Sequence, residues 1–186
     1  MILAAFRRGH QNLNIEALYG AIVAQARTPT FYTRYGIPDT VEGRFELIVL
    51  HLVLLLNRLS RDEARKRDRQ GRTIGQRLFD RFCRDLDDNL REMGVGDLAV
   101  PRRMRRFGEA FYGRQAAYAT ALAAADPQPL ENALARNIFG VAGADERAAC
   151  LARYMRAAAT QLDSEAADTL ATGKAVFPSP EAFAHA

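Results

Sequence analysis

The sequence predicts an all-α protein, a single-domain multi-helix bundle with a central apolar helix and an irregular C-terminal tail. Between residues 74 and 93, apolar side chains recur at steps of three and four, the period of an amphipathic helix. Residues 45–56 are apolar on nearly every side, which is typical of a helix in the middle of a bundle. Because no segment alternates persuasively between apolar and polar residues, we expect no β-sheet.

The length of the chain fits one domain. A chain of 186 residues buries on the order of 70% of its unfolded surface, so it needs neither a metal nor a disulfide to fold. We expect an N-terminal extension at 1–11, a helical domain at 12–173 and a tail at 174–186. Cys83 and Cys150 are the only cysteines, and free thiols in a reducing cytoplasm are the expectation.

The first elements are predicted from caps and breakers. Asn12 or Asn14 can cap a first helix that runs to about Arg27, with Leu13 and alanines 17, 21 and 24 on its apolar side. Residues 31–35 indicate an aromatic turn that Gly36 closes. Residues 39–42 then have the spacing of a capping box, with an acceptor side chain at the cap and a glutamate three residues on.

The central helix is expected to contact other elements on most sides between residues 47 and 56. It is too short and too interrupted to span a bilayer, which takes about 20 apolar residues. His51 is its polar exception, and we interpret it as a core histidine bonded to a neighbouring side chain or carbonyl. A role in reading a partner is the next alternative, ahead of haem ligation.

The amphipathic helix at residues 74–93 is expected to begin at Thr73, as its cap, and to end at Gly94 in a left-handed conformation. Gly96 would give the chain a second permissive hinge. Its polar face carries residues of opposite sign four apart, which stabilise a helix by a few tenths of a kcal/mol each. These pairs are Asp80 with Arg84, Arg81 with Asp85, Arg84 with Asp88, and Asp87 with Arg91.

The C-terminal half contains further helices separated by proline and glycine. Pro101 suits the first turn of the next helix, where a missing N–H costs nothing. A short helix at 130–139 and an amphipathic helix at 144–162 follow the breaks at Pro127, Pro129, Gly140 and Gly143. Residues 176–180 are expected to be extended, either packed on the body or free.

Residues 78–98, taken with residues 100–114 and their ending Phe111-Tyr112-Gly113-Arg114, resemble the ubiquinol–cytochrome c reductase chaperone family. Four upstream pieces follow in the family's order. They are Tyr19-Gly20-Ala21-Ile22-Val23-Ala24-Gln25-Ala26-Arg27, Phe31-Tyr32 with Gly36-Ile37-Pro38-Asp39-Thr40, Gly43-Arg44-Phe45-Glu46, and Leu50-His51. The resemblance covers about residues 18–118, roughly half the chain, and ceases beyond Asp126. Pro101-Arg102-Arg103 departs from the small or lysine-rich residues usual there, which weakens any inference of lysine-specific contacts.

The resemblance implies an assembly chaperone, not an enzyme, that binds newly made cytochrome b and supports biogenesis of the reductase. Its implied partners are cytochrome b, a ribosome or membrane surface, and a small helper protein, without DNA. No cofactor is implied. We expect a bacterial cytoplasmic location, with peripheral association at the inner face of the membrane as an alternative. A ribosome- or anionic-lipid-docking module without client specificity remains a second hypothesis.

The candidate partner-binding surface combines a turn with a basic helix start. The formal net charge is +4, and arginine supplies nearly all of the positive charge. The arginines near 102–106 can contact ribosomal RNA, anionic lipid or an acidic partner, or can form a solvated and partly paired face. Asp97 can cap the next helix or receive Arg91. The chosen residues are Arg91, Gly94, Gly96, Asp97, Arg102, Arg103, Arg105, Arg106, Tyr112 and Arg114.

Catalytic chemistry finds little support in the sequence. Asp85, Asp87 and Asp88 superficially resemble the Mg²⁺ motif of all-α isoprenoid synthases, which makes a small enzyme of that type a third hypothesis. However, Arg91 stands at the fifth position, and no second acidic cluster faces the first. The sequence also has no Ser/His/Asp ordering, glycine-rich phosphate loop or Cys-x-x-Cys motif. We therefore predict no catalytic residues and no metal site.

Overall fold

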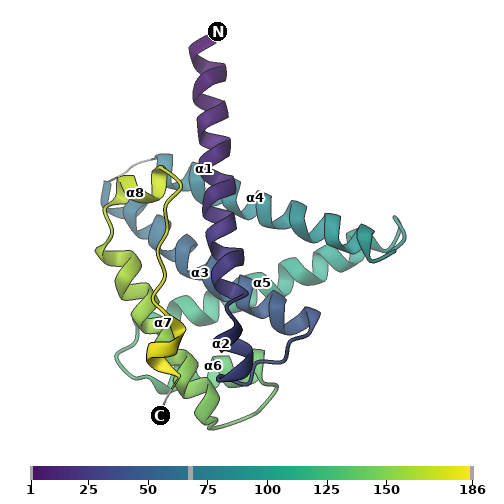
Figure 1. The fold of residues 1–186 in the computed structure, drawn as a ribbon, viewed down its shortest axis with the longest axis vertical. Coiled ribbons are helices and arrows are strands. Elements are labelled where there is room, and N and C mark those ends of the chain that lie inside the picture. The colour runs from purple at the N-terminus through teal and green to yellow at the C-terminus, as the bar shows by residue number, and fades with distance from the viewer. Residues whose placement is uncertain (1, 67–68, 185–186) are drawn as a thin grey trace.

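The structure, a computed structural model, describes residues 2–66 and 69–184, with side chains within 12–61, 74–166 and 168–184. This part of the chain contains helices and no strand, which confirms the all-α prediction (Figure 1). The helices are α1 (Ile2–Ala26), α2 (Pro29–Thr33), α3 (Val41–Lys66), α4 (Arg69–Glu92), α5 (Val100–Ala123), α6 (Gln128–Ile138), α7 (Glu146–Ser164), α8 (Ala167–Ala171) and the 3₁₀ turn η1 (Pro180–Phe183).

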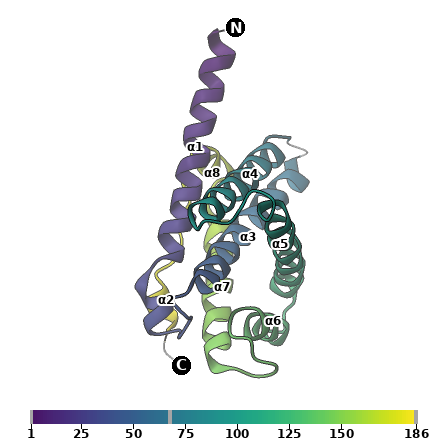
Figure 2. The ribbon, with the colours of Figure 1, turned by 90° about the vertical axis from the view of Figure 1, so that its right-hand side faces the viewer.

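Helix α3 is the centre of the bundle, as predicted. It contacts α1, α4, α5, α6 and α7, and it passes between the other helices in Figure 2. Seven of its apolar side chains between residues 47 and 55 are at most 2% exposed. Burying one such side chain stabilises the fold by about 1.5–3 kcal/mol, so α3 depends on its neighbours for its place in the structure.

His51 is fully buried in α3 and confirms the interpretation as a core histidine. Its Nδ1–H donates to the carbonyl of Leu47 at 2.7 Å, so Nε2 must accept the hydroxyl proton of Tyr154, also at 2.7 Å. The Tyr154 oxygen in turn accepts a bond from Gln25 at 3.0 Å. Burial lowers the pKa of His51 to about 4, which keeps the ring neutral at pH 7. These bonds join α1, α3 and α7.

The start of α3 differs by one residue from the expected capping box. Thr40, and not Asp39, is the cap, and its Oγ1 accepts the backbone N–H of Gly43 at 3.1 Å. The Asp39 carboxylate instead pairs with Arg44 at 2.7 Å. Gly43 is required here because a Cβ on it would lie 2.0 Å from the carbonyl oxygen of Pro38.

Glu46, one turn farther along α3, is held by a partner from α5. Glu46 is 8% exposed, and the Nε–H and Nη2–H groups of Arg114 donate to its two carboxylate oxygens. Burial raises the pKa of Glu46, and the bonds from Arg114 oppose that shift. This ion pair fixes α5 against the first turns of α3.

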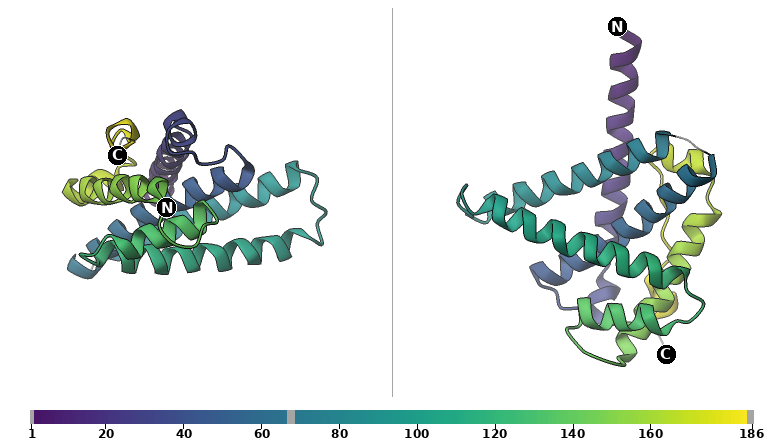
Figure 3. Two further views of the ribbon diagram at one scale, coloured as in Figure 1. Left: turned by 90° about the horizontal axis from the view of Figure 1, so that it is seen from below. Right: turned by 180° about the vertical axis from the view of Figure 1, so that it is seen from behind.

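Helices α4 and α5 form a long hairpin whose closed end extends away from α6, α7 and α8 (Figures 1 and 3). The predicted apolar face of α4 is confirmed, because Leu78, Phe82 and Leu90 on it are buried. Thr73 lies inside α4 and is not its cap, because the helix begins at Arg69. Gly94 ends the turn after α4 with φ of 76°, as predicted.

Two of the four predicted ion pairs on α4 form. Arg81 lies 3.5 Å from Asp85, and Arg91 lies 2.7 Å from Asp87. Arg84 instead donates to the backbone carbonyl of Asp80 at 3.4 Å, so its two predicted pairings are wrong. Asp80 accepts a bond from Gln76 at 2.8 Å, a neutral partner on the same helix that competes for its carboxylate.

Helix α1 is longer than predicted and buries other residues. It begins at Ile2, and Asn14, an expected cap, lies inside it and donates its side-chain N–H to the carbonyl of Ala171 at 2.8 Å. Its buried side includes Ile15, Leu18 and Ile22, whose larger side chains remove more apolar area from water than the alanines we expected. Leu13 is 67% exposed. The boundary at residue 12 stays a prediction.

The C-terminal half follows its breakers, with small shifts. Pro101 lies in the first turn of α5, as predicted. Helices α6 and α7 begin and end one or two residues from their expected bounds. Asp145 caps α7 by accepting the N–H groups of Arg147 and Ala148.

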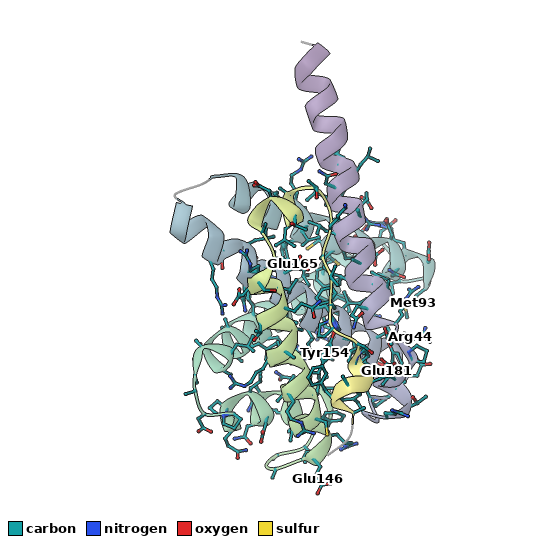
Figure 4. All side chains as sticks on the ribbon, turned by 60° about the vertical axis from the view of Figure 1, so that its left-hand side comes forward. Arg44, Met93, Glu146, Tyr154, Glu165 and Glu181 are labelled. Atoms are coloured by element: carbon teal, nitrogen blue, oxygen red, sulfur yellow. The ribbon has the colours of Figure 1, made fainter. Side chains whose placement is uncertain are left out.

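The tail packs on the body. The Tyr35 hydroxyl donates to the carbonyl of Pro180 at 2.8 Å, and the ring of Phe177 lies 5.0 Å from that of His51. Figure 4 shows Tyr154 of α7 close to this segment, which carries Glu181. The tail therefore covers the buried histidine network.

Replacing Gly43 by alanine should destabilise the protein by about 1–3 kcal/mol, because the new methyl overlaps the Pro38 carbonyl. Gly113→Ala is the matched control, since no atom lies within 4 Å of a Cβ at that position in α5. The control should raise stability by about 1 kcal/mol through helix propensity. Urea unfolding followed by circular dichroism measures both, and equal stabilities would contradict the close approach.

Arg114→Met should destabilise the fold by about 3–5 kcal/mol at neutral pH, because it leaves the buried Glu46 carboxylate unpaired. Burial raises the pKa of Glu46, so this destabilisation is fully present at neutral pH and shrinks as the pH falls through that pKa and the carboxyl becomes neutral. Glu46→Leu combined with Arg114→Met should recover most of the loss. The test is urea unfolding from neutral pH down through the pKa of Glu46. A loss of stability in Arg114→Met that does not change with pH would contradict a buried, unpaired Glu46 carboxylate as its cause.

Candidate functional site

An apolar groove of about 330 Å³ lies where the start of α3 meets the closed half of the α4–α5 hairpin. Its residues come from α3, from the consecutive helices α4 and α5, and from Met93 just after α4. The lining consists of Val41, Glu42, Phe45, Glu46, Leu86, Asn89, Leu90, Met93, Arg106, Phe107, Ala110 and Arg114. We refer to this set as the groove.

Aromatic packing shapes the floor of the groove. The ring of Phe45 lies 4.9 Å from that of Phe107 and 6.1 Å from that of Phe82, measured between centroids. Phe82 also contacts Phe111 on α5, with centroids 5.9 Å apart. Such pairs add about 0.5–1.5 kcal/mol each beyond area burial, so the floor is preformed.

The rim of the groove is open to solvent. Val41 and Met93 are both 59% exposed, so these two apolar side chains of the lining are accessible to a partner. Glu42 and Arg106 are exposed charged residues in the lining, of opposite sign. A groove with this lining can accept apolar side chains and discriminate among polar groups that flank them.

The α4–α5 turn, residues 93–99, settles two expectations from the sequence. Arg91 donates to both Asp87 and Asp97, so Asp97 receives Arg91 and does not cap α5, whose cap residue is Ala99. Gly94 ends α4 in a left-handed conformation, as expected, and its N–H donates to the Arg91 carbonyl at 2.9 Å.

Gly96, expected as a second permissive hinge, adopts no conformation here that only glycine allows. Gly96 is not among the glycines with positive φ, and a Cβ on it would meet open space. Its carbonyl accepts the N–H of Ala99 at 2.8 Å, so the turn closes with ordinary backbone geometry.

The four arginines from 102 to 106 are exposed, and none has an ion-pair partner among the side chains that the structure describes. The partial pairing that we allowed for them is therefore not seen in this part of the chain. Arg106 lines the groove, whereas Arg102, Arg103 and Arg105 are not among its lining residues.

The last group of expected site residues divides between surface and interior. Tyr112 is 59% exposed and packs its ring 5.8 Å from that of Phe79. A Cβ on Gly113 would meet open space. Arg114 is turned toward Glu46 and forms the floor of the groove, so its guanidinium is already used as a bidentate donor.

Sequence reasoning missed the α3 side of the groove, namely Val41, Phe45 and Glu46. One signal could have found it. A glutamate next to a long apolar run, such as Glu46, requires a buried basic partner, and Arg114 was available in the same family-like segment.

Two of the three aspartates that resemble a Mg²⁺ motif are used in contacts within the protein. Asp85 accepts the Tyr19 hydroxyl at 2.9 Å, and Asp87 pairs with Arg91. Within the described residues, no group of three His, Cys, Asp or Glu side chains could hold a metal ion. In the same part of the chain, no helix is both long and apolar enough to cross a bilayer.

Comparisons with known proteins agree with this architecture. The crystal structure of the Cbp3 homolog from Brucella abortus matches with a TM-score of 0.85 and 35% identity, covering 97% of this chain and 98% of that one. Ubiquinol-cytochrome-c reductase complex assembly factor 1 of Xenopus laevis is 25% identical over 162 residues, which is 86% of this chain and 78% of that protein.

A family model described as ubiquinol-cytochrome C chaperone matches residues 33–177. The match includes the whole groove and the α4–α5 turn, and it continues well beyond Asp126, where the sequence alone showed no resemblance. The resemblance inferred from sequence is thereby confirmed: the chain belongs to the ubiquinol-cytochrome C chaperone family, a family of assembly factors for ubiquinol–cytochrome c reductase.

Proposed function

We propose that this protein is a non-enzymatic chaperone that binds newly made cytochrome b during assembly of the reductase, and that the groove is its client site. The family and its assembly-factor relatives support the process. The observation that carries the site is an open apolar groove with exposed Val41 and Met93 at its rim. Exposed apolar surface of this kind on a folded helical body is typical of a protein-binding site.

The size of the groove limits what it can hold. A volume of about 330 Å³ accommodates a few apolar side chains and is too small to enclose a whole membrane-spanning helix. The client would therefore present one face of a helix, with side chains three and four residues apart entering the groove. This contact covers part of an aggregation-prone segment and leaves the rest free to enter the membrane.

The preformed floor favours capture without a large conformational change. Phe45 and Phe107 are already in contact, and the Glu46–Arg114 pair fixes the helices that carry them. Binding then costs little ordering entropy beyond that of the client itself. Arg106 and Glu42, at the rim, would read polar groups that flank the apolar face of the client.

A client-blind electrostatic docking module is the second candidate, and the exposed arginines at 102–106 favour it. Salt separates the two candidates. Binding driven by phosphate contacts weakens steeply with ionic strength, whereas capture through the apolar groove persists.

The double variant Val41→Glu and Met93→Lys should reduce the cytochrome b that co-purifies with the chaperone by at least about tenfold, because it removes apolar contacts from the rim. Glutamate at the first position of α3 and lysine after the last turn of α4 both suit the helix dipoles, so folding should be preserved. The measurement is affinity capture from membranes of a deletion strain expressing the variant.

The matched control is Leu13→Lys with Val176→Glu, which places the same two charges on exposed apolar residues outside the groove. The control should retain capture and restore cytochrome b on a haem-stained gel. Equal capture by both double variants would rule out the groove as the client site.

A further inference from the structure

We infer that the end of the α4–α5 hairpin is a docking surface for anionic phospholipid, distinct from the groove. Three observations point to it. Leu98 is 99% exposed at this end, arginines 102, 103 and 105 follow it in the first turns of α5, and the hairpin carries both away from the rest of the body (Figures 1 and 3).

Leu98 is exposed on a turn that is held in place. Arg91 bonds Asp97, its immediate neighbour, and the N–H of Val95 donates to the carbonyl of Leu90 at 3.0 Å. On the other side, Val100 is buried and anchors the start of α5. A leucine on a fixed turn loses little conformational freedom when it enters the boundary between headgroups and acyl chains.

The positive charge at this end lies on α5. Asp87 and Asp97 share the single positive charge of Arg91, so one negative charge remains on that group, and the exposed Glu92 adjoins the turn. Asp88 and Glu109 lie one helical turn farther back on α4 and α5. Against them stand the exposed arginines of α5, which have no ion-pair partners among the described side chains. Arginine forms bidentate bonds with phosphate, the group that anionic lipids present.

The chemistry of this surface favours lipid over single-stranded RNA. Proteins that bind RNA strands combine arginines with exposed aromatic rings on which bases stack. Residues 93–106 contain no aromatic residue, and the ring of Tyr112 already packs on Phe79 and Phe111. An exposed aliphatic side chain beside several arginines is instead the combination that lies at a membrane interface. Such docking would hold the groove near the place where apolar helices enter the bilayer.

The test is cosedimentation of the full chain with vesicles of phosphatidylcholine and phosphatidylglycerol in a ratio of about seven to three. The wild type should bind these vesicles and not those of pure phosphatidylcholine. The triple variant Arg102→Glu, Arg103→Glu and Arg105→Glu should bind about 100-fold more weakly, given roughly fivefold per basic residue near an anionic surface. Leu98→Ser should weaken vesicle binding about tenfold, and this loss should persist at a salt concentration that screens the arginines.

The control is Arg27→Glu, Arg136→Glu and Lys174→Glu, which changes net charge equally on exposed residues away from the hairpin. It should stay within about threefold of the wild type if the docking surface is local. Equal weakening by both triple variants, or no vesicle binding by the wild type, would overturn the inference. So would a result in which the variant at residues 102, 103 and 105 loses binding to RNA but keeps binding to the vesicles. The groove variant Val41→Glu/Met93→Lys should keep vesicle binding, so failure of the client site remains distinguishable.

Discussion

The fold depends on the burial of one helix that is apolar on nearly every side. Helix α3 can be stable only when other helices surround it, and α1, α4, α5, α6 and α7 all contact it. This enclosure ends at the first turn of α3, where Val41 is exposed while Phe45 still packs on α5. The groove lies at the end of the central helix that its neighbours cover incompletely.

Three buried polar residues on α3 give this apolar packing a defined arrangement. Glu46 binds Arg114 of α5, His51 binds Tyr154 of α7, and Arg58 donates to the carbonyl of Leu162 at 2.9 Å. Apolar contacts alone tolerate sliding of one helix along another, whereas a misplaced partner would leave a buried polar group unsatisfied. We interpret these three residues as the features that set which helix faces which side of α3.

Features that follow from the spacing of residues along the chain were predictable from the sequence. Features that depend on which of several partners a side chain bonds were not. Continuous apolar character predicted the buried α3, and the left-handed turn at Gly94 followed from a glycine at the end of a periodic stripe. The cap at Thr40 and the inward direction of Arg114 depend on tertiary partners that no local pattern reveals. The α3 wall of the groove was missed for the same reason, because it exists only when three separate helices meet.

The most direct test of the client site is photo-crosslinking from Asn89, which lines the groove, in cells that are making cytochrome b. Asn132, exposed on α6, is the reference position for an otherwise similar side chain. A crosslink to newly made cytochrome b from position 89 and not from position 132 is the predicted result. Absence of a crosslink from position 89, or equal yields from both positions, would contradict a client held in the groove.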